Sequence, residues 1–192
     1  PDHVPQLIRM ACAIELNQGD SESLLVWAPI HALRTLGQLR VEAAVEPLLG
    51  LLDQAAEWED DWALEELPEV FGMLGPQVMP ALKEFLADPS RALYARTSVA
   101  RAFEEIAKRH PESRPACIAS LTLQLERYMA NDPELNGFLV ASLLDMEAVE
   151  SAELIKEAFA ADSVDESIVG DWYDVATELG LDVPEPPPET RH

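Results

Sequence analysis

The chain contains few of the residues that mark disulfide-bonded, zinc-binding or all-β proteins. Among 192 residues there are two cysteines, Cys12 and Cys117, and they form neither a disulfide framework nor a zinc-binding pattern. Aromatic residues are 6% of the chain and glycines number 8. Ala, Leu and Glu dominate instead, and that composition is typical of packed helices. We therefore predict an all-α protein in a reducing setting, the cytoplasm.

Long hydrophobic runs are also missing. No stretch approaches the ~20 apolar residues that a membrane-spanning helix requires, and residues 4–14 are too short and lack a basic lead. Hydrophobic residues nevertheless make up 48% of the chain, enough for a continuous core. We expect a folded chain that does not insert into a membrane.

Basic residues are scarce and unevenly placed. The chain has 13 Lys and Arg against 36 Asp and Glu, a formal charge of −23. Between Arg40 and Lys83 there are ten acidic residues and no basic one, whereas residues 83–127 hold eight basic residues. Such a field repels nucleic acid and attracts cationic partners. We predict a protein partner with a basic segment, and no nucleic acid.

The sequence repeats itself. Residues 27–39 read WAPIHALRTLGQL and residues 62–74 read WALEELPEVFGML, with their aromatic, apolar and glycine positions in register. Pro47, Pro80 and Pro115 recur after the first-helix motif, and proline suits the first turn of a helix. Each unit is therefore predicted to be two helices that bury their apolar faces against the next unit. The residues expected to be buried are Leu36, Leu39, Leu49, Phe71, Leu74, Leu82, Phe103, Ile106 and Cys117.

This pattern, carried by residues 27–53 and 68–89, resembles HEAT-like repeats of the kind found in phycobilisome lyases and bacterial scaffold proteins. The resemblance implies a right-handed α-solenoid of about four helical hairpins over residues 24–160, and for most members a binding role. Residues 1–23 would form a partial leading repeat and residues 161–181 a C-terminal capping helix. Residues 182–192 are rich in proline and are expected to be a disordered tail.

Catalytic patterns are not evident. The four histidines lie far apart, and there is no HExxH, GxSxG or glycine-rich phosphate loop. Asp132 opens a stretch that imitates a calcium loop, but it fits a helix cap better because Leu143 stands where a bidentate carboxylate is required. We expect no cofactor and no catalytic residue. The resemblance to lyases leaves a chromophore-handling role open, and the charge leaves an acidic mimic of nucleic acid open.

The segment EWEDDWALEELPE, residues 57–69, combines acids with two tryptophans. Asp61, Glu65 and Glu69 recur every four residues, a spacing at which like charges repel, and tryptophan faces attract cations. A solvated helix face and a loose divalent-cation site are the alternatives. Farther along, Arg91, Arg96, Arg101, Lys108 and Arg109 are interpreted as internal charge balance, with docking of an acidic ligand as the alternative. The predicted partner-binding residues are Trp58, Asp60, Asp61, Trp62, Glu65, Glu66 and Glu69.

Overall fold

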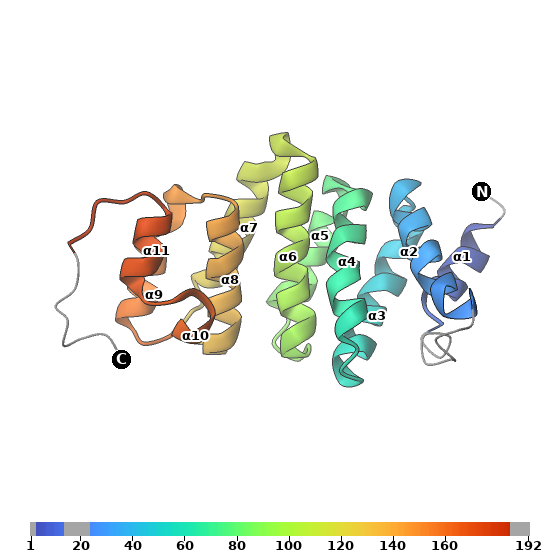
Figure 1. Cartoon of the computed structure of the whole chain (residues 1–192), viewed down its shortest axis with the longest axis horizontal. Coiled ribbons are helices and arrows are strands. Elements are labelled where there is room, and N and C mark those ends of the chain that lie inside the picture. Colours follow the sequence, from blue (N-terminus) through green and yellow to red (C-terminus); the bar gives the residue numbers. More distant parts are fainter. Residues whose placement is uncertain (1–2, 14–23, 185–192) are drawn as a thin grey trace.

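The computed structural model describes residues 3–13 and 24–184, and every regular element among them is helical (Figure 1). The all-α prediction is thus confirmed for this part of the chain. The α-helices are α1 (Val4–Ala11), α2 (Ala28–Gln38), α3 (Val45–Glu57), α4 (Asp61–Leu74), α5 (Met79–Ala87), α6 (Leu93–Arg109), α7 (Arg114–Leu125), α8 (Pro133–Asp145), α9 (Ala152–Ala160), α10 (Glu166–Val169) and α11 (Trp172–Glu178). The 3₁₀ turns are η2 (Leu24–Trp27), η3 (Glu42–Ala44), η4 (Pro76–Val78), η5 (Pro111–Ser113) and η6 (Val149–Ser151).

The helices pair into hairpins that stack in two layers. Each of η3, η4, η5 and η6 joins one helix to the next, giving the pairs α2–α3, α4–α5, α6–α7 and α8–α9. The first helices α2, α4, α6 and α8 contact one another in chain order, and the second helices α3, α5, α7 and α9 do the same behind them (Figure 1). Helix α1 packs against α2 at one end, and α11 packs against α9 at the other.

Prolines stand where the second helices begin. Pro80 and Pro115 lie in the first two positions of α5 and α7, and Pro47 lies in the first turn of α3. Proline has no amide hydrogen to donate, and amides of the first turn have no partner within the helix, so nothing is lost there. Pro68 is not one of these markers, because it lies inside the first helix α4. The sequence markers therefore found the correct starts of the second helices.

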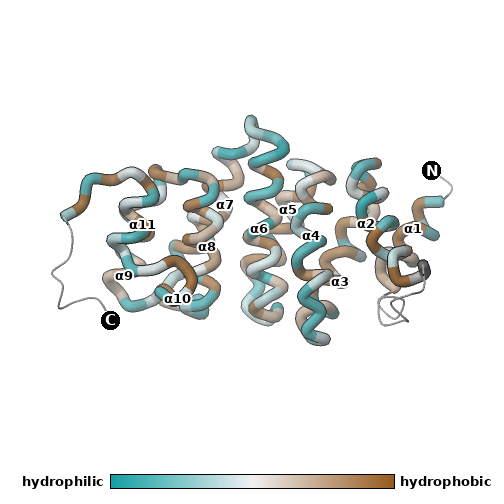
Figure 2. Tube along the Cα trace, viewed as in Figure 1, coloured by the Kyte–Doolittle hydropathy of each residue, from teal (hydrophilic) through white to brown (hydrophobic). Residues whose placement is uncertain are grey.

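The core follows the predicted repeat with one error. Phe71, Phe103 and Leu36 have no exposed surface, and the other predicted core residues are buried as well, except Leu39. Leu39 is 63% exposed because α2 ends at Gln38 and Leu39 is its C-cap, so its side chain has left the buried stripe. In Figure 2, hydrophobic and hydrophilic stretches alternate along the helices, as expected for helices with one buried face.

The centre of the molecule is closely packed around one glycine. A Cβ atom added at Gly72 on α4 would lie 2.8 Å from the Cβ of Glu105 and 3.1 Å from its backbone carbonyl carbon. Real Cβ atoms do not approach that closely, so a side chain at this position would push α4 and α6 apart. Glycine here keeps α6 close to α4 and thereby holds the first-helix layer together.

The C-terminal region corrects one expectation. Instead of one capping helix over residues 161–181, there are two short helices, because Gly170 adopts a φ of 78° and ends α10. Asp171 and Asp174 then form a capping box that starts α11. Asp165 caps α10, and Gly180, at a φ of 73°, follows α11. Most of the expected tail, residues 185–192, lies outside the described residues, as do residues 14–23 of the leading repeat.

Within the described ranges, no helix is both long enough and apolar enough to cross a membrane.

Candidate functional site

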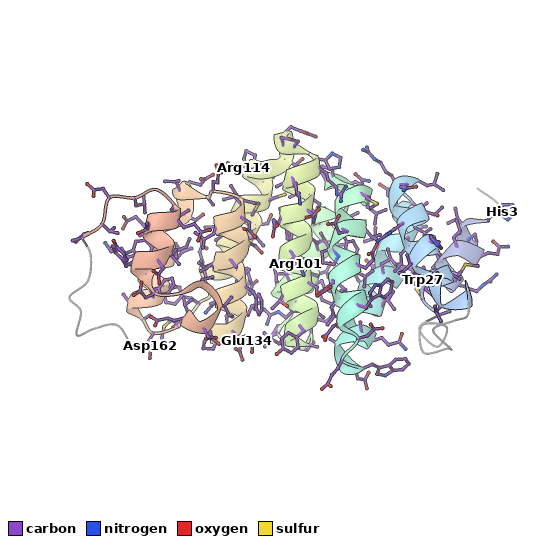
Figure 3. All side chains as sticks on the ribbon, viewed as in Figure 1. His3, Trp27, Arg101, Arg114, Glu134 and Asp162 are labelled. Carbon is purple, nitrogen blue, oxygen red and sulfur yellow. The ribbon has the colours of Figure 1, made fainter. Side chains whose placement is uncertain are left out.

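A solvent-open recess of about 450 Å³ lies between the start of α2 and the turn that joins α3 to α4. We call it the tryptophan recess, because three of the four tryptophans in the chain line it. Figure 3 labels one of them, Trp27, near α2. The described residues that line the recess are Val26, Trp27, Ile30, Trp58, Glu59, Asp60 and Trp62.

The α3–α4 turn presents three of these residues. Trp58 is the C-cap of α3, and Glu59 follows in the left-handed conformation with a φ of 54°. The Asp60 amide then donates to the Ala55 carbonyl at 2.9 Å, which completes a Schellman closure of the helix. The Asp60 carboxylate accepts from the Ala63 amide at 3.2 Å and so caps α4. Two helix ends therefore fix the backbone that carries Trp58, Glu59 and Asp60.

The rings of the recess differ in how much of their surface is available. Trp27 is 52% exposed and Trp58 is 47% exposed. Trp62 is half-buried and packs against the core. Exposed large aromatic side chains that gather in a concavity often mark a binding site. Trp27 and Trp58 can therefore contact a ligand, while Trp62 also supports the fold.

The electrostatic character of the recess is acidic. Among the described residues that line it, Glu59 and Asp60 are charged and none is basic. The Glu59 carboxylate forms no ion pair or hydrogen bond with the residues that the structure describes. Acidic residues of α4, α8 and the α3–α4 turn, namely Asp61, Glu134 and Glu59, also act on Tyr94 of α6; we call these residues, with Asp60, the acidic edge. A hydrogen bond from the Tyr94 hydroxyl to the Glu134 carboxylate, and the charge of Glu134, raise the pKa of Tyr94. The charges of Asp61 and Glu59 act on Tyr94 in the same direction.

The structure separates the seven predicted partner-binding residues into three groups. Trp58, Asp60 and Trp62 line the tryptophan recess together. Asp61 and Glu65 instead line a smaller depression of about 210 Å³ beside Tyr94 and Arg101. The third group is Glu66 and Glu69.

Glu66 and Glu69 are engaged within the molecule. The Arg34 guanidinium donates to both Glu66 oxygens, from Nε at 2.6 Å and from Nη2 at 2.9 Å, and this bidentate pair links α2 to α4. The Glu66 side chain is 10% exposed. Glu69 pairs with Arg109 and so links α4 to α6. These two carboxylates therefore join first helices; the Glu66 side chain is nearly buried, whereas that of Glu69 is 42% exposed.

Sequence reasoning missed Trp27 and Glu59. A signal for Trp27 was present, because the two matching segments begin with Trp27 and Trp62 at equivalent positions. Stacked repeats bring equivalent positions of neighbouring units side by side, so the pair could have been predicted. Val26 and Ile30 belong to the same helix start. Glu59 has no such signal, since the direction of its side chain depends on its own left-handed backbone conformation in the turn.

The basic residues of the centre act mostly within the molecule. Arg91 pairs with Asp53 and Asp88, and Lys108 pairs with Glu105 at 3.2 Å. Arg96 is buried and donates to the Leu86 carbonyl at 2.9 Å. Together with the Arg109–Glu69 pair, these contacts support internal charge balance for three of the five residues, Arg91, Lys108 and Arg109, whereas Arg96 bonds to a neutral carbonyl. Arg101 is exposed, and it forms no ion pair among the residues that the structure describes.

Other reactive groups do not gather into a site. In the described ranges, no three His, Cys, Asp or Glu side chains are placed to hold a metal ion. Burial raises the pKa of Cys117 to about 11 and also raises the pKa of Cys12. Both thiols are therefore protonated near neutral pH and are poor nucleophiles. Asp132 caps α8 by accepting from the Glu134 amide at 2.9 Å, as the sequence indicated.

A pair of carboxyl groups joins α6 to α8. Burial, followed by the nearby charges of Asp145 and Glu105, raises the pKa of Glu104 to about 7, and a hydrogen bond with Asp145 adds to the rise. Arg101 acts in the opposite direction. Because the folded chain holds this proton more tightly than the unfolded chain, the associated stability is complete below pH ~4 and is lost as pH rises through 7.

We expect Glu104→Gln to raise the free energy of unfolding at pH ~8 by about 1–2 kcal/mol, and to change it little at pH ~5. The figure is reduced from ~3 kcal/mol because Glu104 is partly exposed and solvent screens its charge. Urea unfolding followed by far-UV circular dichroism at both pH values measures the effect. Glu153→Gln, at an exposed position on α9, is the control and should show no such difference. Equal effects of Glu104→Gln at the two pH values would contradict the assignment.

The sequence matches no protein-family model, and neither curated proteins nor solved structures gave a match. The function proposed below therefore rests on the residues and their geometry.

Proposed function

We propose that this chain binds a cationic segment of a partner protein at the tryptophan recess. The observation that carries the proposal is the gathering of Trp27, Trp58 and Trp62 around a concavity whose charged lining residues, Glu59 and Asp60, are both acidic. Tryptophan is the aromatic side chain whose face attracts a cation most strongly. Two carboxylates beside those faces add a favourable Coulomb interaction for lysine or arginine and an unfavourable one for an anion.

The charge of the chain supports the same ligand. A formal charge of −23, with ten acids and no basic residue between Arg40 and Lys83, draws cationic segments from a distance. Four of the residues that line the recess, Trp58, Glu59, Asp60 and Trp62, belong to that acidic part of the chain. Long-range attraction would raise the association rate, and the recess would hold the cationic side chain after the encounter.

We further propose that the two helical layers form a right-handed, HEAT-like α-solenoid that works in the cytoplasm as a binding module or scaffold. The support is the order of the hairpins, in which each first helix contacts the next first helix and each second helix the next second helix. Such stacking repeats the same surface positions from one unit to the next. The recess is one product of that stacking, since Trp27 and Trp62 come from equivalent positions of adjacent units.

The test is a titration with a short lysine- and arginine-rich peptide, followed by tryptophan fluorescence in the Trp172→Phe variant. That variant keeps Trp27, Trp58 and Trp62, so its signal reports on the recess. We expect saturable binding that weakens with added salt, and none with an acidic peptide of the same length. Replacing Glu59 with Gln and Asp60 with Asn should weaken binding about tenfold, because the charges are lost. Asn at position 60 still caps α4.

The matched control repeats these changes at another helix cap. Asp165 accepts from the Ser167 amide at 2.9 Å and caps α10, and its neighbour Glu166 is exposed. Asp165→Asn with Glu166→Gln therefore alters the net charge equally while leaving the recess unchanged. If both double variants weaken the peptide to the same extent, binding responds to total charge and the proposed site is wrong.

A further inference from the structure

The lining of the tryptophan recess holds three indole rings and few side-chain hydrogen-bond acceptors. Trp27, Trp58 and Trp62 supply indole groups, whose N–H can donate but not accept, and Val26 and Ile30 supply apolar side chains. The side-chain acceptors in the described lining are the carboxylates of Glu59 and Asp60. Asp60 already uses one oxygen to cap α4. Among the described lining residues, only the Glu59 carboxylate and the second Asp60 oxygen are left as side-chain acceptors to replace water that a ligand loses on entering the recess.

That shortage discriminates between two kinds of ammonium group. A primary ammonium carries three N–H donors, and each donor that loses water without finding an acceptor lowers the affinity. A fully alkylated ammonium carries no donor, and its positive charge is spread over methyl groups that can lie against ring faces. Aromatic cages that recognise quaternary ammonium groups use this principle. The carboxylates of Glu59 and Asp60 can balance the charge without a direct hydrogen bond.

We infer that the tryptophan recess prefers a trimethylated lysine side chain over an unmodified one. The inference rests on the proposed function, because the segment that carries this side chain is the cationic segment proposed above. The volume of about 450 Å³ is within the range of ligand sites and exceeds what a single head group fills, so the aliphatic stem of the lysine can enter as well. The stem would contact Val26 and Ile30, and the head group would contact the rings.

The experiment uses the full chain with Trp172→Phe and three peptides of one lysine-rich sequence, followed by tryptophan fluorescence. The central residue is lysine, trimethyl-lysine, or the uncharged analogue in which carbon replaces the ammonium nitrogen. We expect trimethyl-lysine to bind at least about fivefold more tightly than lysine, and also more tightly than its uncharged analogue. Tetramethylammonium, added alone, should compete with the trimethylated peptide.

A variant tests whether the recess is responsible. Trp27→Ala should reduce the preference for the trimethylated peptide to about one, because a ring face is lost, while the helical content stays unchanged since Trp27 is half exposed. Leu123→Ala is the control: Leu123 is 61% exposed on α7, and its replacement should leave the preference intact. Trp58→Ala provides a second recess variant if Trp27→Ala alters folding.

The outcomes separate the two proposals. Equal binding of the lysine and trimethyl-lysine peptides would overturn the preference and leave the proposed function standing. Failure of both peptides together with tetramethylammonium would overturn both. Binding of tetramethylammonium without either peptide would overturn the proposed partner segment, and it would support the ammonium preference with a free molecule as the ligand. A preference that persists in the Trp27→Ala and Trp58→Ala variants would place the recognition outside the recess and overturn the inference.

Discussion

Replacing Phe103 with alanine should lower the free energy of unfolding by about 3–5 kcal/mol. Phe103 has no exposed surface and lies on α6, which contacts α4, α7 and α8 and so joins neighbouring hairpins in both layers. The substitution removes a large side chain, and the helices around it cannot close completely on the cavity. Since folded domains are stable by roughly 5–15 kcal/mol, the loss is a large part of the total. Urea unfolding followed by far-UV circular dichroism measures it.

The control for Phe103 is an exposed apolar residue of the same hairpin. Leu123→Ala on α7 should cost less than ~1 kcal/mol, because its side chain is mostly in solvent. If Phe103→Ala also costs less than ~1 kcal/mol, the stacking of α6 between its neighbours is wrong. Both variants keep the charge of the chain unchanged, so the comparison isolates packing.

Replacing Trp27 and Trp58 together with alanine should weaken binding of the cationic peptide by about 30-fold or more. The two rings are half exposed and supply the ring faces most open to a ligand. Removing them leaves Glu59 and Asp60 in place, so long-range attraction persists and the loss should appear mainly as faster dissociation. Surface plasmon resonance with the peptide immobilised measures both rates.

The single replacement of Trp172 by alanine is the comparison for this double variant. Trp172 lies on α11 and contacts Phe159, with ring centroids 6.2 Å apart, at the opposite end of the molecule from α2. It should affect stability but not peptide affinity. A double variant at Trp27 and Trp58 that binds as tightly as the original chain would show that the acidic edge alone attracts the peptide.

The repeat predicted most of the fold because burial and proline position are local properties of the sequence. Phe71 and Phe103, separated by one repeat, occupy equivalent buried positions, and Pro80 and Pro115 stand in the first turns of second helices. Leu39 was misplaced because its motif continues one residue beyond the end of α2, and motif spacing does not specify where a helix stops. The break before α11 was missed for a similar reason, since Gly170 can either stay in a helix or end it.

The candidate site was predicted only in part, because charge pairing and side-chain direction depend on tertiary contacts. Trp58, Asp60 and Trp62 were found from their density in one segment. Glu66 looked like its neighbours in the sequence, yet Arg34 from the preceding repeat engages it. Trp27 lies 31 residues before Trp58 in the sequence, and only the stacking of hairpins brings the two together. Patterns within one segment cannot show which acids are engaged by a distant arginine.

The most direct test of cation binding at the tryptophan recess is a titration of the ¹⁵N-labelled chain with the lysine- and arginine-rich peptide, observed at the four indole N–H signals. Single tryptophan-to-phenylalanine variants assign the signals. If the recess binds the peptide, the signals of Trp27, Trp58 and Trp62 shift together along one saturating curve, and that of Trp172 stays in place. A shift confined to Trp172, or no indole shift while the peptide binds, would contradict the account.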